Sequence, residues 1–127
     1  MDKKILVVDD EEAIRGVFEQ AFQKAGYIVH CAESAEEALE VLKQDNIQVM
    51  FLDLNLPGMN GTDLCKQIRK DKPIAIIHAV TGYTSLFELT DCREAGFDDY
   101  FTKPVDLKSL YKAAEDAFEK LDRWKER

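Results

Sequence analysis

The stretch Lys3-Lys4-Ile5-Leu6-Val7-Val8-Asp9-Asp10-Glu11-Glu12 decides the fold that we predict for this chain. Its apolar residues, Ile5 to Val8, lie between charged residues on both sides. A short continuous apolar run of this kind indicates a β-strand that is buried on both faces. Such strands occur mainly in parallel sheets that helices cover on both sides. The acids Asp9 and Asp10 then follow the carboxyl end of a buried strand.

The rest of the chain repeats this pattern of a short strand followed by a helix. Apolar residues at helical spacing predict helices between the strands, and the Ser34–Glu37 capping box predicts where the second one begins. Asn60 or Thr62 is expected to cap the third helix, Ser85 the fourth and Asp106 the fifth. We expect strands at residues 5–8, 27–31, 49–52, 74–80 and 100–102.

Alternating strands and helices predict an α/β fold with a parallel sheet. Right-handed crossovers leave few topologies for five strands. We expect a single doubly wound, flavodoxin-like sheet with strand order 2-1-3-4-5 and helices on both faces. At 127 residues the chain fits one domain, without a disulfide or a metal to stabilise it.

The composition excludes several classes of function. The formal net charge of −8 argues against a surface that binds nucleic acid directly. No apolar run approaches the length of a membrane span, and no signal peptide opens the chain. The three cysteines match neither a zinc pattern nor a redox pair, which favours a reducing compartment. We therefore expect a cytoplasmic protein without membrane insertion.

Polar residues follow four of the predicted strands. Asp9 and Asp10 follow the first, Asp53 the third, Thr81 the fourth and Lys103 the fifth. In doubly wound sheets the binding site lies at the carboxyl ends of the strands, so these side chains should meet there. Clustered carboxylates without histidine or cysteine suit Mg²⁺. The ammonium and the hydroxyl suit a phosphoryl group, so this edge predicts phosphoryl transfer to a carboxylate.

Asp53 is the best candidate for the nucleophile because it ends the central buried strand. Other uses of such a sheet need motifs that this chain lacks. It has no G-x-x-x-x-G-K-[ST] for a P-loop and no G-x-G-x-x-G for a dinucleotide. A flavin mononucleotide site needs small hydroxyl and glycine residues after the first strand, where this chain has four acids.

Four motifs resemble those of the receiver domain of two-component response regulators, which has the chemotaxis-type (CheY-like) fold. The motifs lie at residues 7–11, 53–61, 80–82 and 95–104, as Val-Val-Asp-Asp-Glu, Asp-Leu-Asn-Leu-Pro-Gly-Met-Asn-Gly, Val-Thr-Gly and Ala-Gly-Phe-Asp-Asp-Tyr-Phe-Thr-Lys-Pro. The resemblance covers essentially the whole chain. It implies one receiver domain over residues 1–127 with no effector domain.

The resemblance also implies a role for each residue at the acidic edge. Asp53 accepts a phosphoryl group from the phosphohistidine of a sensor histidine kinase or of a phosphotransfer protein. Mg²⁺ is bound directly by Asp10 and Asp53, largely through water by Asp9, and by the backbone carbonyl of Asn55. The chain is then a regulator and not an enzyme, apart from its own phosphorylation and dephosphorylation.

A second group of residues is expected to bind the phosphoryl group and to transmit its presence. Lys103 pairs with the acceptor and then with the phosphoryl group, and its bond to Pro104 is expected to be cis. Thr81 moves toward the phosphoryl oxygen, Gly82 leaves room for it, and Tyr100 turns inward. A downstream protein then binds the face formed by the fourth helix, the fifth strand and the fifth helix.

Two positions are expected to tune how long the phosphoryl group lasts, namely Asn55 and Tyr83, whose bulk should restrict attacking water. Three alternatives to a stand-alone switch stay open at this point. The chain could relay the phosphoryl group from Asp53 to another histidine. It could be an aspartate-nucleophile phosphatase, although Asn55 stands where that class has a second aspartate. It could also be a degenerate scaffold, which the complete acidic, threonine and lysine set argues against.

Overall fold

The computed structural model of the chain describes residues 2–82 and 86–125. It contains one five-stranded sheet in the order β2-β1-β3-β4-β5, and all neighbouring strands are parallel. The strands are β1 (Lys4–Val8), β2 (Ile28–Ala32), β3 (Val49–Asp53), β4 (Ile76–Thr81) and β5 (Asp99–Thr102). The α/β fold and the strand order predicted from the sequence are thereby confirmed.

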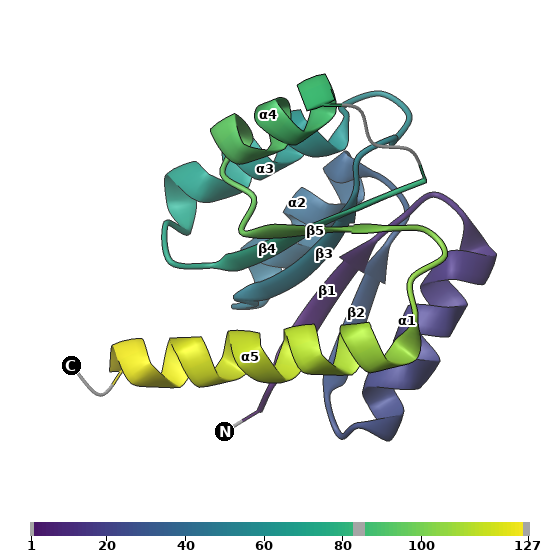
Figure 1. Cartoon of the computed structure of the whole chain (residues 1–127). Coiled ribbons are helices and arrows are strands. Elements are labelled where there is room, and N and C mark those ends of the chain that lie inside the picture. The colour runs from purple at the N-terminus through teal and green to yellow at the C-terminus, as the bar shows by residue number, and fades with distance from the viewer. Residues whose placement is uncertain (1, 83–85, 126–127) are drawn as a thin grey trace.

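Helices cover both faces of this sheet (Figure 1). They are α1 (Glu12–Lys24), α2 (Ala35–Gln44), α3 (Gly61–Asp71), α4 (Leu86–Ala95) and α5 (Leu107–Lys125). Figure 1 shows α1 and α5 on one side, and α2, α3 and α4 on the other. None of the described helices combines the length and the apolar composition needed to cross a membrane.

The two predicted strands that differ most from the structure are displaced by local hydrogen bonds. The second strand begins at Ile28 because the N–H of Tyr27 bonds to Phe22 at the end of α1. The fourth strand begins two residues later than expected, at Ile76. Before it, the N–H of Ala75 closes a turn onto the Lys72 carbonyl. In both cases the backbone N–H of the residue just before the strand is bonded within a turn. The hydrogen bonds between the strands therefore begin only after that residue.

Side chains cap the helices at most of the predicted positions. Ser34 Oγ accepts from the N–H of Glu37 at 3.1 Å, and Asp106 Oδ1 accepts from the N–H of Ser109 at 2.7 Å. At α3 the cap is Asn60, which accepts from the N–H of Asp63 at 2.9 Å. The predicted cap Ser85 lies outside the described residues.

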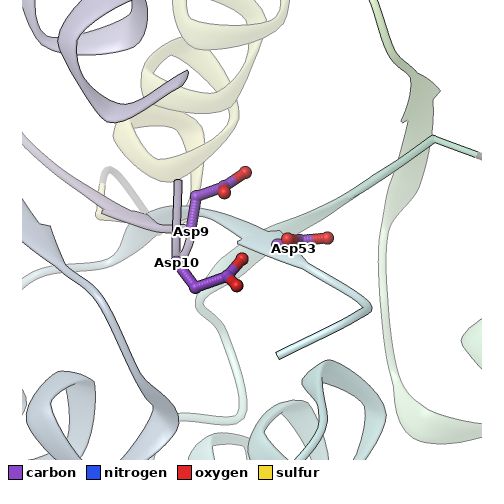
Figure 2. Close-up of side chains that lie close together, drawn as sticks. All are labelled: Asp9, Asp10 and Asp53. Carbon is purple, nitrogen blue, oxygen red and sulfur yellow. The ribbon is translucent and has the colours of Figure 1, made fainter. Parts of the chain in front are cut away.

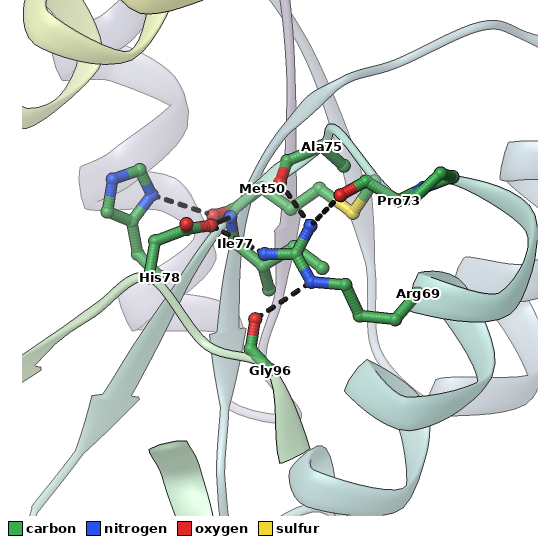
Figure 3. Close-up of polar contacts among 8 residues, drawn as sticks. Met50, Arg69, Pro73, Ala75, Ile77, His78 and Gly96 are labelled. Carbon is green, nitrogen blue, oxygen red and sulfur yellow. Dashed lines mark hydrogen bonds and ion pairs between the residues drawn. The ribbon is translucent and has the colours of Figure 1, made fainter. Parts of the chain in front are cut away.

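The buried histidine of β4 packs as an aromatic residue. His78 is 4% exposed and stacks on Phe51, with ring centroids 4.2 Å apart. Its Nδ1 lies 3.0 Å from the Met50 carbonyl oxygen, which can only accept, so Nδ1 carries the proton (Figure 3). Burial lowers the pKa of His78, which is therefore neutral near pH 7. His78 is therefore packed as a neutral residue of the core.

An arginine from α3 joins the segments that precede β4 and β5 (Figure 3). The guanidinium of Arg69 donates to the carbonyl oxygens of Pro73, Ala75 and Gly96. It also forms an ion pair with Asp98 at 2.7 Å. Because guanidinium donors have a fixed planar geometry, this set of bonds fixes where β5 enters the sheet.

Candidate functional site

Three aspartates meet at the carboxyl edge of the sheet (Figure 2). Asp9 and Asp10 follow β1, and Asp53 is the last residue of β3. One carboxylate oxygen from each lies within 4.8 Å of the other two. Asp9 and Asp53 are only 2% and 3% exposed, whereas Asp10 is exposed. The structure therefore brings together the acids predicted to hold a metal ion.

Asp53 is held by the backbone that follows it. Its Oδ1 accepts from the N–H of Asn55 at 3.1 Å. Burial raises the pKa of Asp53, and the nearby charge of Asp9 raises it further. The hydrogen bond from Asn55 and the charge of Lys103 oppose this rise. The ionised carboxylate is therefore less favourable here than in water, and a nearby cation relieves that penalty.

The close packing around Asp53 involves a glycine whose role the sequence does not reveal. A Cβ atom on Gly61 would overlap the carbonyl oxygen of Asp53 and would lie 2.8 Å from Leu54 Cα. The N–H of Gly61 also donates to the Leu54 carbonyl at 3.1 Å. In sequence Gly61 indicates only a loop, since nothing shows which backbone lies beside it.

Both carboxylate oxygens of Asp9 have partners. Oδ1 accepts from the N–H of Glu11 at 2.9 Å, and Oδ2 lies 2.9 Å from Lys103 Nζ. The Asp9 N–H donates to the Ala32 carbonyl of β2 at 3.1 Å. Asp9 is thus fixed at its backbone and at its side chain.

Lys103 bridges the acids at the ends of β1 and β3. Its Nζ lies 2.9 Å from Asp9 Oδ2 and 3.4 Å from Asp53 Oδ2. Burial alone would lower the pKa of Lys103, but the hydrogen bonds and charges of the two carboxylates outweigh it and raise the pKa. Its backbone N–H donates to the Thr81 carbonyl at 2.7 Å, and its peptide bond to Pro104 is cis.

The residues expected to respond to the phosphoryl group lie on β4 and β5. Thr81 ends β4 and is fully buried, opposite Thr102 in the register. Tyr100 is 43% exposed on the edge strand β5. A surface hollow of about 690 Å³ lies beside it, lined by side chains of α4 and of the α4–β5 turn. In this structure the Tyr100 side chain therefore faces outward.

The remaining predicted positions surround the same edge. Gly82 is exposed, and a Cβ atom placed there would meet no described atom within 4 Å. Asn55 is exposed, and its N–H is the donor to Asp53. Tyr83 lies outside the described residues, so its effect on phosphoryl lifetime stays a prediction.

The donor set fits a hard divalent cation. The three clustered groups are all carboxylates, and one oxygen from each lies within 4.8 Å of the other two. Oxygen donors without histidine or thiolate select Mg²⁺ over softer metals. The cysteines do not compete in this chemistry, since burial raises the pKa of Cys65 to about 12 and of Cys31 to about 11.

Comparisons with known proteins identify the family and the fold of this chain. Residues 5–115 match the response regulator receiver domain family. A CheY-like receiver domain protein from Methanospirillum hungatei is 35% identical, with a TM-score of 0.88 over 99% of this chain and 98% of that one. A receiver protein from Pseudomonas putida is 30% identical, with a TM-score of 0.87 over 91% and 98%. The chemotaxis protein CheY4 of Vibrio cholerae is 28% identical, with a TM-score of 0.88 over 92% and 99%.

Proposed function

This chain belongs to the response regulator receiver domain family, and we propose that it is a switch controlled by phosphorylation of Asp53. One observation carries the proposal. The Asp53 carboxylate is buried at the end of β3, within reach of two further aspartates and of the Lys103 ammonium. These side chains would supply a nucleophile, a cation site and a positive charge at one point, which supports the proposal.

In the proposed reaction, a carboxylate oxygen of Asp53 attacks the phosphorus of a phosphohistidine. The new O–P bond forms while the N–P bond to the histidine breaks, and the imidazole leaves. Such transfers depend mainly on positioning and on neutralising charge on the equatorial phosphoryl oxygens. Mg²⁺ supplies part of that neutralisation when it is held by Asp9, Asp10, Asp53 and the Asn55 carbonyl.

The chain's own residues supply the rest. The N–H of Asn55 orients Asp53 through Oδ1. Lys103 is already beside Oδ2 of both buried acids, so its ammonium can move to a phosphoryl oxygen with little reorganisation. The donor is a protein with a phosphohistidine, such as a sensor histidine kinase or a phosphotransfer protein. The chain then acts as a regulator and not as an enzyme with a separate substrate.

The signal is proposed to leave the site through Thr81 and Tyr100. The Thr81 carbonyl accepts from the N–H of Lys103, so the end of β4 and the segment after β5 are directly joined. Movement of the Thr81 hydroxyl toward the phosphoryl group would leave room for Tyr100 to turn inward. That turn would reshape the hollow beside α4 and β5, where a downstream protein would bind. A switch from 1:99 to 99:1 needs about 5.5 kcal/mol of preference between the two states.

The decisive experiment is labelling with acetyl phosphate and Mg²⁺, followed by intact mass measurement. We expect the native chain to gain the mass of one phosphoryl group and Asp53→Asn to gain none. The matched control is Asp63→Asn, which changes an exposed aspartate in the first turn of α3 and should be labelled like the native chain. Chelation of Mg²⁺ should abolish labelling. Equal labelling of Asp53→Asn would refute the proposal.

A further inference from the structure

The Asp10 carboxylate differs in its contacts from the carboxylates of Asp9 and Asp53. In the described part of the chain, Asp53 and Asp9 each have hydrogen-bonded carboxylates, while Asp10 has no such bond and no ion pair. Even so, its carboxylate extends toward Asp53 (Figure 2), and one of its oxygens lies within 4.8 Å of an oxygen of each of the other two aspartates. With no bond to its carboxylate, the placement of Asp10 depends on the peptide group that precedes it.

That peptide group is held by an arginine of α1. Arg15 Nη1 donates to the Asp9 carbonyl oxygen at 2.8 Å. On the other side of the residue, the Asp9 N–H is fixed by the Ala32 carbonyl at 3.1 Å. Because a peptide unit is planar, holding its carbonyl oxygen also fixes the nitrogen and Cα of Asp10. The Asp9–Asp10 turn is thus fixed by two hydrogen bonds from different elements.

The Asp9 carbonyl is the main partner of the Arg15 side chain. The backbone N–H of Arg15 bonds to the Glu11 carbonyl, which places Arg15 in the first turn of α1. Its side chain is 18% exposed, so the hydrogen bond to Asp9 is partly shielded from water. The charged partner of Arg15, Glu33, is more distant at 3.9 Å, and the Glu33 side chain is 65% exposed. The contact with the Asp9 carbonyl is therefore the stronger of the two.

We propose that Arg15 is a positioning residue that aims the Asp10 carboxylate at the cation site through the Asp9 carbonyl. This inference rests on the Mg²⁺ site of the proposed function. It predicts that loss of Arg15 changes the Mg²⁺ affinity in the direction opposite to the one expected from charge alone. Removing a positive charge close to three acids should by charge alone tighten Mg²⁺ binding. Loss of an orienting hydrogen bond should weaken it.

The experiment is a calorimetric titration of the full chain with Mg²⁺. We expect Arg15→Met to weaken binding about tenfold, the lower end of what loss of an orienting partner costs at metal sites. Arg15→Lys, which keeps a donor and the charge, should fall between Arg15→Met and the native chain. Glu33→Gln should bind nearly as tightly as the native chain, because it leaves the Asp9 contact in place. Lys43→Met removes an exposed positive charge elsewhere and should not weaken binding.

Two further measurements separate positioning from a general loss of structure. The free energy of unfolding without Mg²⁺ shows whether Arg15→Met is still folded at the titration temperature. The labelling rate with acetyl phosphate should be low for Arg15→Met at limiting Mg²⁺ and should return to the native rate at saturating Mg²⁺. If Arg15→Met does not fold, Arg15→Lys compared with Glu33→Gln makes the same test.

The outcomes are distinct. Equal or tighter Mg²⁺ binding by Arg15→Met, with a native chain that binds Mg²⁺, overturns the role of Arg15 and leaves the proposed function intact. A native chain that binds no Mg²⁺ overturns both. Weaker binding that saturating Mg²⁺ compensates supports Arg15 as the positioning residue.

Discussion

Lys103 Nζ lies 2.9 Å from Asp9 Oδ2, closer than the 3.4 Å that separates it from Asp53 Oδ2. A side chain that follows β5 thereby pairs with the acid at the end of β1, across the two strands that lie between them. Asp9 and Asp53 are almost fully buried, so solvent screens their mutual repulsion poorly. The Lys103 ammonium is the positive charge that lies beside both carboxylates.

Replacing Lys103 with methionine should therefore destabilise the protein when Mg²⁺ is chelated. Removing one partner of a buried charge group leaves the others uncompensated, and here we expect a loss of about 2 kcal/mol in the free energy of unfolding. Addition of Mg²⁺ should restore part of the loss, because the ion supplies positive charge at the same acids. Urea denaturation with and without Mg²⁺ measures both effects.

The control for this change is Lys112→Met. Lys112 pairs with Asp116 at 3.4 Å on the exposed face of α5. Exposed pairs of this kind contribute less than about 1 kcal/mol, and this one has no acidic cluster beside it. A loss as large for Lys112→Met as for Lys103→Met, or no recovery with Mg²⁺, would contradict the role assigned to Lys103.

Asp53→Asn should make the protein more stable at pH 7 in the absence of Mg²⁺. Burial and the charge of Asp9 raise the pKa of Asp53, so ionisation of Asp53 opposes folding above that pKa. Asparagine keeps an acceptor for the N–H of Asn55 without the charge, and we expect a gain on the order of 1 kcal/mol. The gain should vanish as the pH falls through the folded pKa toward 3.8, the ordinary value.

When Mg²⁺ is present, the native chain should become more stable than Asp53→Asn. A ligand that binds only the folded state stabilises it more when it binds more tightly, and Asp53→Asn removes one carboxylate from the proposed cation site. Thermal unfolding at rising Mg²⁺ should therefore raise the midpoint of the native chain more than that of the variant. Glu119→Gln, an exposed change on α5, should follow the native chain. Equal shifts for all three proteins would show that Asp53 does not hold the ion.

The position of these acids was predictable because it depends only on the sheet. Apolar runs such as Ile5 to Val8 mark buried strands, and the carboxyl ends of parallel strands meet at one edge. Asp9, Asp53 and Lys103 are therefore brought together by topology alone. The same reasoning applies to caps, where Ser34 and Asp106 bond to backbone a few residues away.

Contacts with distant backbone were not predictable. Arg15 and Arg69 bond to carbonyl oxygens that no sequence pattern marks as lacking a partner. The packing of Gly61 against the Asp53 backbone depends on how the loop after β3 folds back. Ile74 reads as the start of a strand, yet it is 52% exposed before the ladder begins. These features follow from the folded arrangement and leave only weak traces in local sequence.

His78 should make the stability of the protein depend on pH below neutrality. Burial lowers the pKa of His78 from 6.5, although the hydrogen bond to Met50 and the charges of Asp98 and Asp99 oppose this. Below pH 6.5 the unfolded chain therefore binds a proton that the folded chain refuses. Stability is full above pH 6.5 and should fall on acidification by up to about 1.4 kcal/mol per pH unit. His78→Phe should reduce that slope.

The second histidine, His30, provides the control for this dependence of stability on pH. His30 lies on the edge strand β2, beside Asp45 at 3.1 Å, with a side chain that is 36% exposed. His30→Gln should keep the acid-dependent loss seen in the native chain. Urea denaturation at several pH values between 5 and 8, the range in which an ordinary histidine titrates, measures the slope. An unchanged slope in His78→Phe would assign the effect to other groups.

Gly61→Ala should displace Asp53, the proposed phosphoryl acceptor, without changing any charge. The new Cβ would overlap the Asp53 carbonyl and crowd Leu54 Cα, both of which are backbone atoms that cannot rotate away. The loop or the end of β3 must then shift. Such overpacking costs about 1–3 kcal/mol, and the Asp53 carboxylate should move with its backbone. We expect lower stability and slower labelling by acetyl phosphate.

Gly16→Ala is the matched control, since it adds the same methyl group where there is space. Gly16 lies within α1, and a Cβ atom there meets nothing within 4 Å. Alanine is the better helix former, so Gly16→Ala should raise stability by up to about 1 kcal/mol with an unchanged labelling rate. If Gly61→Ala behaved like Gly16→Ala in both measurements, the loop would be free to move away from Asp53. The close contact would then have no part in holding the acceptor, and its position would depend on Asn55 and Lys103 alone.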